Sequence, residues 1–364
     1  MLPTTPSSSP VASAEVVTTF ARRSFGLALG ACAITARGLA QTAPRDDLSP
    51  GDAAGGLVGP LRVVTIITSD LAPLLHFYGD GLGLSSASVP AAPDALNRFW
   101  GMPAGLRWTA HVLTRTAAPT ATMIRVLVTE RPTPSIRRTW SRQELGPYGM
   151  GFPTVDVPGW DARMRDLAFV RATSEIERFP LKRPDGTPYE VMEATFNGPE
   201  FLRAIAISRR DGMAQVGDMD PATGRGGPAY ATQIVTEGQM QAVLDFFTGV
   251  LDFEVRTDRM WRTYDVPFRF ATVHAKGSNT GHVALAAYAE KDVQPGTGTV
   301  PAPPNRGMAI WSFPVKNLSA FAGRARNAAI VAGPMRADLP GLGKVQAMTV
   351  RLPSGFLIEA YQNE

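Results

Sequence analysis

The side chains in this chain that could perform acid–base chemistry or bind a metal are few. It has one cysteine, Cys32, and four histidines, His76, His111, His274 and His282. No Gly-rich phosphate loop, nucleophile elbow or Cys/His zinc spacing is present in the sequence. The candidate chemistry therefore depends on single polar residues within apolar, strand-like segments rather than on a linear catalytic motif.

Glu359 is the strongest catalytic candidate. It lies in an apolar run near the C-terminus, where alternation puts Leu357, Glu359 and Tyr361 on one face of a strand. If that face points inward, we expect Glu359 to meet Trp311 or a neighbour. Desolvation of a carboxylate without a cation would then raise its pKa and suit it to proton transfer. The opposite face assignment makes Glu359 a solvated carboxylate.

His274 and His282 flank a turn-like segment, residues 276–281, and are expected to be cross-strand neighbours. A His/His/Glu metal site that includes Glu359 is one interpretation. The favoured interpretation is a solvent-exposed hairpin without metal, because a third ligand near the pair is not evident. We therefore predict no cofactor, with a divalent Fe, Zn or Mn ion as the alternative.

Further candidates for ligand binding are Thr232, Arg269, His274, Trp311 and Tyr361. An inward arginine within an apolar strand would bind a carboxylate or phosphate through two hydrogen bonds. The alternative is an outer-face arginine whose stem packs on the sheet. The two aromatic residues could line a pocket for a flat or apolar ligand, or belong to the core.

An internal repeat determines which elements would position these residues. The strand-like residues 63–67 are followed by an amphipathic helix at 70–80, and the strand-like residues 232–236 by a similar helix at 239–249. The same helical spacing recurs at 318–325 and, more weakly, at 160–167. Each helix precedes extended runs, at 107–113, 123–129, 190–196, 201–207, 269–274, 282–288, 345–352 and 356–361. The pattern predicts an α+β fold of four βαβββ modules.

Composition shifts suggest where the modules are joined. Pro/Gly-rich segments at 44–60 and 210–228 are expected to be a flexible lead-in and a linker. The predicted organisation is an export signal at 1–43 and two similar domains, at 61–209 and 229–364. Each domain would contain two modules and one pocket.

The repeat resembles the vicinal oxygen chelate superfamily, which includes glyoxalase I, extradiol dioxygenases and bleomycin-resistance proteins. The motif residues are Asp70-Leu71, Phe77-Tyr78 and Leu82-Gly83, with Phe246-Phe247 and Leu251 in the second copy and the closing segment 353–359. Gln239 and Asp252 depart from the pattern. The resemblance implies two half-open sheet barrels, each around a pocket.

In that superfamily a divalent metal is usually held by His or Gln and Glu on strands that face the barrel. The corresponding positions here fall at Val63, Phe152, Thr232, Ala204 and about Ile310. Of the metal-binding residues only Glu359 remains, so the resemblance implies a site without the usual metal. The leading hypothesis is a protein that binds a small organic molecule and that could act on it as an acid–base isomerase or lyase. The alternatives are a metal-dependent dioxygenase or glyoxalase relative with a rearranged site, and a non-catalytic ligand-sequestering or scaffold protein.

The N-terminal residues resemble an export signal. Arg22-Arg23 precedes a mild apolar stretch and the small-x-small site Gly38-Leu39-Ala40, which is typical of a twin-arginine leader. We therefore expect a periplasmic or secreted protein; a lipid anchor at Cys32 is the less favoured alternative. The net charge is only +4 with charges scattered along the chain, so nucleic acid is not an expected partner, and no apolar run is long enough to span a membrane. The oligomeric state is left open.

Overall fold

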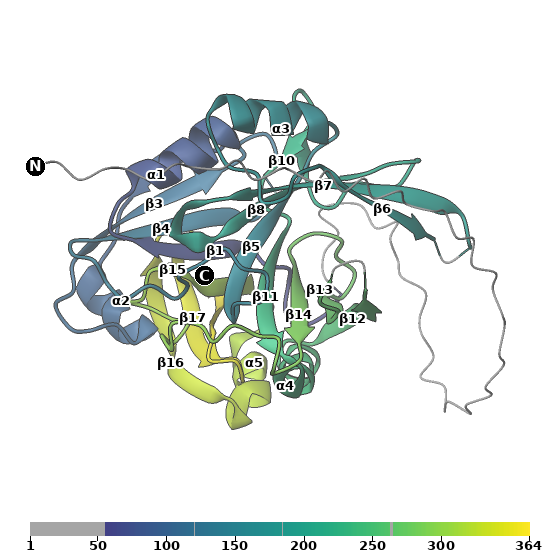
Figure 1. Cartoon of the computed structure of the whole chain (residues 1–364). Coiled ribbons are helices and arrows are strands. Elements are labelled where there is room, and N and C mark those ends of the chain that lie inside the picture. Colours follow the sequence, from purple (N-terminus) through teal and green to yellow (C-terminus); the bar gives the residue numbers. More distant parts are fainter. Residues whose placement is uncertain (1–54, 120, 184, 263–264) are drawn as a thin grey trace, which may run out of the picture. The chain divides into compact units, whose positions relative to one another are not determined.

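The architecture consists of two eight-stranded sheets with helices packed against them (Figure 1). It is seen in a computed structural model that describes residues 55–364 except 120, 184, 263 and 264. The predicted export signal at 1–43, with Arg22, Arg23 and Cys32, lies outside the described residues. All described residues belong to one compact unit of the chain, residues 43–364.

The four expected βαβββ modules are present, which confirms the predicted fold class. The first contains β1 (Val63–Thr68), α1 (Ala72–Leu74), η1 (Leu75–Gly81), β2 (Ser85–Val89), an additional helix α2 (Pro93–Trp100), β3 (Trp108–Thr114) and β4 (Met123–Thr129). The second contains β5 (Gly146–Pro153), α3 (Val157–Asp166), β6 (Glu177–Lys182), β7 (Pro188–Asn197), η2 (Pro199–Phe201) and β8 (Arg203–Arg209). The third contains β11 (Tyr230–Thr236), α4 (Glu237–Gly249), β12 (Phe253–Trp261), β13 (Phe268–Ala275) and β14 (His282–Tyr288). The fourth contains β15 (Gly307–Pro314), α5 (Leu318–Arg324), η3 (Ala325–Asn327), β16 (Ala329–Leu339), β17 (Gly343–Arg351) and β18 (Leu357–Asn363).

The two sheets do not coincide with the two halves of the sequence. The strand order of the first sheet is β16-β17-β18-β15-β1-β4-β3-β2, and that of the second is β12-β13-β14-β11-β5-β8-β7-β6. Module one therefore shares a sheet with module four, and module two with module three, through antiparallel β1–β15 and β11–β5 pairs. The expectation that each sequence half forms its own barrel is wrong for the strand pairing. The domain boundaries at 61–209 and 229–364 stay a prediction.

The segments between modules are more ordered than their composition predicted. The 210–228 segment contains a short hairpin of β9 (Met219–Asp220) and β10 (Arg225–Gly226). In the described part of the expected lead-in, Val58 is fully buried and forms a bridge with Val315. A Pro/Gly-rich composition thus predicts a lack of long helices and strands here, but not mobility.

Both predicted helices form close to their expected bounds. Thr236 begins α4 with a capping box, in which its side chain accepts from the Gln239 backbone N–H while the Gln239 side chain accepts from the Thr236 backbone N–H. In the first module Pro73 lies at the start of α1, where its missing N–H costs no helical hydrogen bond.

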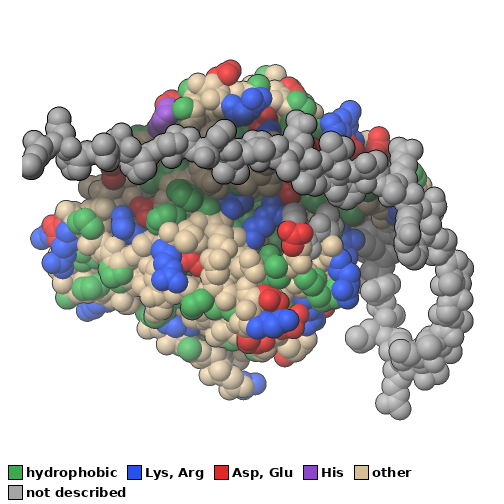
Figure 2. All heavy atoms as spheres, viewed as in Figure 1, with side chains coloured by type: hydrophobic (Ala, Val, Ile, Leu, Met, Phe, Trp, Pro, Cys, Tyr) green, Lys and Arg blue, Asp and Glu red, His purple; other side chains and the backbone are tan. Residues whose placement is uncertain are grey.

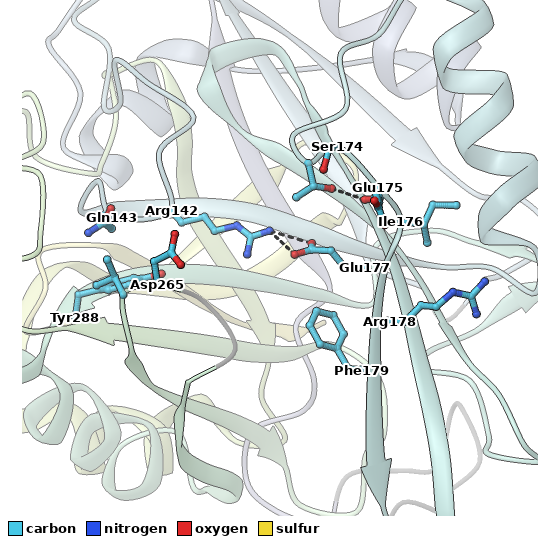
Figure 3. Close-up of a pocket in the computed structure, with 12 residues that line it drawn as sticks. Arg142, Gln143, Ser174, Glu175, Ile176, Glu177, Arg178, Phe179, Asp265 and Tyr288 are labelled. Atoms are coloured by element: carbon cyan, nitrogen blue, oxygen red, sulfur yellow. Dashed lines mark hydrogen bonds and ion pairs between the residues drawn. The ribbon is translucent and has the colours of Figure 1, made fainter. Parts of the chain in front are cut away.

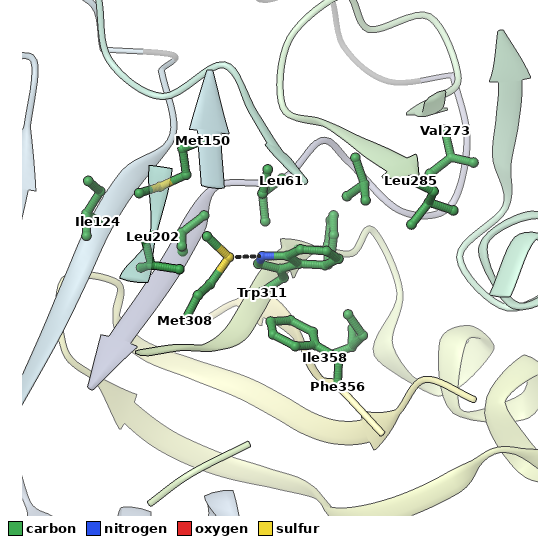
Figure 4. Close-up of a cluster of buried hydrophobic side chains, with 14 of the residues drawn as sticks. Leu61, Ile124, Met150, Leu202, Val273, Leu285, Met308, Trp311, Phe356 and Ile358 are labelled. Carbon is green, nitrogen blue, oxygen red and sulfur yellow. Dashed lines mark hydrogen bonds between the residues drawn. The ribbon is translucent and has the colours of Figure 1, made fainter. Parts of the chain in front are cut away.

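The helices α1, η1, α3, α4 and α5, which contribute to the largest core cluster, cover one face of each sheet and build a core that both sheets share. This cluster includes Phe77, Trp160, Phe247 and Phe321 from the helices. Figure 4 shows its centre, where Trp311 packs on Phe356 with ring centroids 4.3 Å apart and its Nε1–H points at the Met308 sulfur. We call the opposite face of each sheet its barrel face. In that terminology Trp311 lies on the shared-core side, not on a barrel face.

Candidate functional site

Four polar side chains from four adjacent strands meet on the barrel face of the first sheet. Arg125 on β4 donates from Nε to Thr65 Oγ1 on β1 at 2.9 Å and from Nη2 to Glu359 Oε1 on β18 at 2.9 Å. Ser312 on β15 donates its hydroxyl to the same carboxylate oxygen at 2.7 Å. All four side chains are fully buried. The arrangement is an ion pair with hydroxyl partners at the centre of the sheet.

Helix α2 covers this cluster. Its last residue, Trp100, donates Nε1–H to Glu359 Oε2 at 2.7 Å, and its ring lies 4.8 Å from the Arg125 guanidinium carbon. The helix ends at Gly101, whose left-handed φ of 67° suits glycine. Thr349 on β17 holds the helix by donating to the Phe99 carbonyl. The barrel face of the first sheet is therefore filled by the protein itself.

These residues do not suit a divalent metal. Both oxygens of Glu359 already accept hydrogen bonds, and the Arg125 guanidinium supplies the positive charge. The remaining donors, Thr65 and Ser312, are neutral hydroxyls, which are weak ligands compared with imidazole or carboxylate. Among the described residues, no group of three His, Cys, Asp or Glu side chains could hold a metal ion.

The expectations for Glu359 are met only in part. Leu357, Glu359 and Tyr361 do share a buried face. The premise that the carboxylate lacks a cation is wrong, because Arg125 neutralises it. The expected neighbour Trp311 lies on the other face, and Trp100 occupies that place. A catalytic role for Glu359 stays a prediction.

The barrel face of the second sheet lacks an equivalent ion pair. By strand pairing and the position of the bulge in the first strand, Thr65, Arg125, Ser312 and Glu359 correspond to Thr232, Ala284, Gly151 and Ile205. Thr232 keeps 7% of its surface exposed and Ile205 8%, whereas their counterparts in the first sheet have none. Solvent reaches this face.

The two histidines are cross-strand neighbours on this second barrel face, as expected, but the expected solvent exposure is wrong, because each is only 7% exposed. Their rings stack with centroids 4.3 Å apart and planes within 12°, and Tyr230 stacks on the other side of His282. Burial, followed by the charge of nearby groups including Arg256, lowers the pKa of His274 well below its ordinary value; burial and nearby arginines lower that of His282 to about 3. Both imidazoles are therefore neutral at pH 7. Because imidazole lone pairs lie in the ring plane, stacked parallel rings do not converge on one metal ion.

The remaining candidates are placed apart from one another. Glu359 belongs to the first sheet, so it does not join His274 and His282 in a metal site. Arg269 lies on the face of β13 opposite His274 and forms a two-bond ion pair with Asp258, at 2.8 and 2.7 Å. This is the outer-face alternative considered for that arginine. Of the candidates for ligand binding, Thr232 and His274 are the two on the second barrel face.

A cavity of about 770 Å³ opens at the edge of the second sheet (Figure 3). Arg142 extends into it and donates from Nη2 to both oxygens of Glu177, at 3.1 and 2.9 Å. Phe179 on β6 and Tyr288 on β14 supply aromatic surface. The other lining residues are Gln143, Thr173, Ser174, Glu175, Ile176, Arg178, Asp265 and Val266.

The sequence reasoning missed Glu193, which lies beside this cavity. It is directly opposite Glu177 in the β6–β7 pair, so the two carboxyl groups share a face. Burial, followed by the charge of Glu177, raises the pKa of Glu193 to about 7. None of the described residues donates a hydrogen bond to its side chain. A charged residue inside the apolar run 191–196 was the signal in the sequence that could have identified it.

Neither the surface charges nor the helices indicate a particular class of binding partner. Figure 2 shows side chains of both charges interspersed over the uncovered part of one face. In the described part of the chain, no helix is both long enough and apolar enough to cross a membrane.

The fold is that of the vicinal oxygen chelate superfamily. Glyoxalase I from Zea mays aligns with a TM-score of 0.54 and 13% identity, over 84% of this chain and 92% of that one. A variant of the same enzyme aligns with a TM-score of 0.56, 13% identity and coverage of 84% and 94%. A putative dioxygenase from Bacillus subtilis aligns with a TM-score of 0.52 and 15% identity, over 84% and 86%. No family model matches the sequence, and no curated protein matches it. At these identities the likeness shows the fold alone.

Proposed function

We propose that this protein binds a small organic ligand on the barrel face of the second sheet, without the divalent metal typical of the fold. The observation that carries this proposal is the difference between the two barrel faces. In the first, Arg125 and Glu359 form an ion pair beneath Trp100. In the second, the equivalent positions are small or apolar and a cavity of about 770 Å³ lies at the sheet edge.

The size and lining of the cavity support a small molecule. Ligand pockets in proteins usually span about 300–1,000 Å³ and combine apolar walls with a few polar groups. Phe179, Val266 and Tyr288 provide the apolar walls here, and Arg142 with Glu177 provides fixed polar groups. Binding alone accounts for this arrangement, and catalysis is not part of the proposal.

A matched pair of substitutions tests the location of the site. Ile176→Trp places a larger side chain in the cavity wall, and Ile330→Trp makes the same change at an exposed position of the other sheet. A panel of small aromatic fragments is screened by ligand-observed NMR. We expect fragments to bind the wild type and Ile330→Trp but not Ile176→Trp. Equal binding to both variants would place the site elsewhere.

Elemental analysis of the purified protein tests the alternative of a metalloenzyme. We expect less than about 0.1 equivalent of Fe, Zn or Mn, because the polar cluster of the first sheet is already neutralised by Arg125. Near-stoichiometric metal that is lost in Glu359→Gln would favour a dioxygenase or glyoxalase relative with a rearranged site.

We also propose that the protein is exported to the periplasm or secreted. The support is the twin-arginine pattern Arg22-Arg23 followed by an apolar stretch. The test is the double substitution to lysine, described below.

A further inference from the structure

The cavity at the edge of the second sheet has more acidic than basic groups. Its lining holds Glu175, Glu177 and Asp265 against Arg142 and Arg178. Of these two arginines, Arg178 forms a 2.8 Å ion pair with Glu190, which does not line the cavity. Glu193 is not a lining residue, but it pairs with the lining residue Glu177 across the β6–β7 ladder, which brings a further carboxyl next to the cavity.

The two central carboxyl groups have one guanidinium between them. Arg142 donates both hydrogen bonds of its Nη2 to the carboxylate of Glu177. Glu193 therefore forms no ion pair with this arginine. The groups that face Glu193 are Glu177 on β6, the uncharged Ile207 on β8, and Arg142 from the loop before β5. Like charges directly opposite in a sheet destabilise each other. The side chain of Glu193 is half-buried, and either a proton or a positive charge from outside the chain relieves this repulsion.

A second polar group in the cavity is also without a partner. Tyr288 is 3% exposed and lines the cavity, and its hydroxyl forms no hydrogen bond with any described residue. Burial raises the pKa of Tyr288 to about 12, so the group stays a neutral phenol. A tyrosine hydroxyl in a cavity wall that forms no hydrogen bond within the protein is available to a ligand.

We propose that this cavity binds an organic ammonium ion with an apolar or aromatic body, whose cationic group pairs with Glu193 and hydrogen-bonds to the Tyr288 hydroxyl. Phe179 and Tyr288 provide the aromatic surface for the body of such a ligand and for cation–π contact. An anionic ligand would meet the carboxylates of Glu175 and Glu177. The inference rests on the proposed function, since it names the class of ligand for the same cavity.

The proposal predicts a specific pH dependence. The carboxyl of Glu193 has a pKa of about 7, so it changes from mostly neutral to mostly ionised between pH 6 and 8. A cation binds the ionised form, and its affinity should therefore rise by about tenfold over that range. A neutral ligand would show no such increase.

Isothermal titration calorimetry with benzylamine, benzyl alcohol and benzoate at pH 6 and pH 8 tests the proposal. We expect benzylamine to bind best and to gain about tenfold in affinity at pH 8. Glu193→Gln should weaken its binding by about tenfold and remove the pH dependence, whereas Glu193→Asp should keep the dependence. Glu130→Gln makes the same chemical change beside the other sheet and should behave like the wild type.

The outcomes separate the two proposals. If benzyl alcohol or benzoate binds as well as benzylamine, and Ile176→Trp abolishes that binding, the ligand class is wrong while the cavity remains the binding site. If benzylamine binding is unchanged in Ile176→Trp, the proposed site is wrong as well. Absence of binding by all three compounds, or an unchanged pH dependence in Glu193→Gln, would also overturn the inference.

Discussion

Replacing Glu359 by glutamine should strongly destabilise the protein, although the two side chains have nearly the same shape. The carboxylate accepts from Arg125 and Ser312 at one oxygen and from Trp100 at the other. A glutamine must turn its NH₂ group toward one of these donors, and it leaves the buried Arg125 charge without a counter-ion. Breaking a fully buried ion pair in this way costs about 3–5 kcal/mol. A Glu359 without a cation would instead tolerate this substitution, because no buried charge would be left unpaired.

Urea unfolding followed by tryptophan fluorescence and circular dichroism measures this loss. The exposed pair Arg178–Glu190 provides a matched control, in which Glu190→Gln should change the free energy of unfolding by less than about 1 kcal/mol. The double variant Arg125→Met/Glu359→Leu removes both charges and should recover most of the stability, since apolar replacements of buried ion pairs are often neutral. If the free energy of unfolding of Glu359→Gln lies within about 1 kcal/mol of the wild-type value, the ion pair does not stabilise the first sheet as described.

Three further predictions concern other parts of the chain. Trp100→Phe removes the indole bond to the carboxylate and should lower the free energy of unfolding by about 1.5–3 kcal/mol in the same urea assay; no loss would show that the bond is dispensable. The NMR signals of His274 and His282 should not titrate between about pH 5.5 and 8. Because their pKa values are lowered in the folded state, unfolding takes up protons in acid, so stability should fall as the pH drops below the unfolded value of about 6.5 toward about 3. Replacing Arg22 and Arg23 by lysine should leave unprocessed protein in the cytoplasm, and normal periplasmic levels of processed protein would contradict the export proposal.

The third and fourth strands of each module were predicted from the sequence, whereas the second strand was missed in all four modules. The buried strands β4 and β14 form within the expected bounds, because their apolar side chains lie between neighbours in the sheet. The strands not identified were β2, β6, β12 and β16, and these four are the edges of the two sheets. Edge strands carry many exposed polar residues, as the burial of β2 shows, so their apolar periodicity is weak.

The candidate site was harder to predict because it depends on pairing between distant segments. Alternation placed Glu359 on the correct face, but its partner Arg125 lies 234 positions away and on a strand of another module. A single sequence does not indicate that module one pairs with module four. The same uncertainty put Glu359 together with His274 in one expected pocket, although they belong to different sheets. Local pattern predicts elements and faces, whereas the partners of a buried charge depend on the tertiary pairing.

The two barrel faces illustrate how one fold can separate stability from binding. In the first sheet, both carboxylate oxygens of Glu359 accept hydrogen bonds, and the cluster is buried and covered by α2, so a ligand would have to displace Trp100 to reach it. In the second sheet, the corresponding positions Gly151 and Ile205 carry no charge, and the paired carboxyl groups of Glu177 and Glu193 lie at the edge. A fully satisfied buried network stabilises a structure, while an unpaired carboxyl beside a cavity does not. The group that a ligand can use is therefore the one that the protein leaves without a partner.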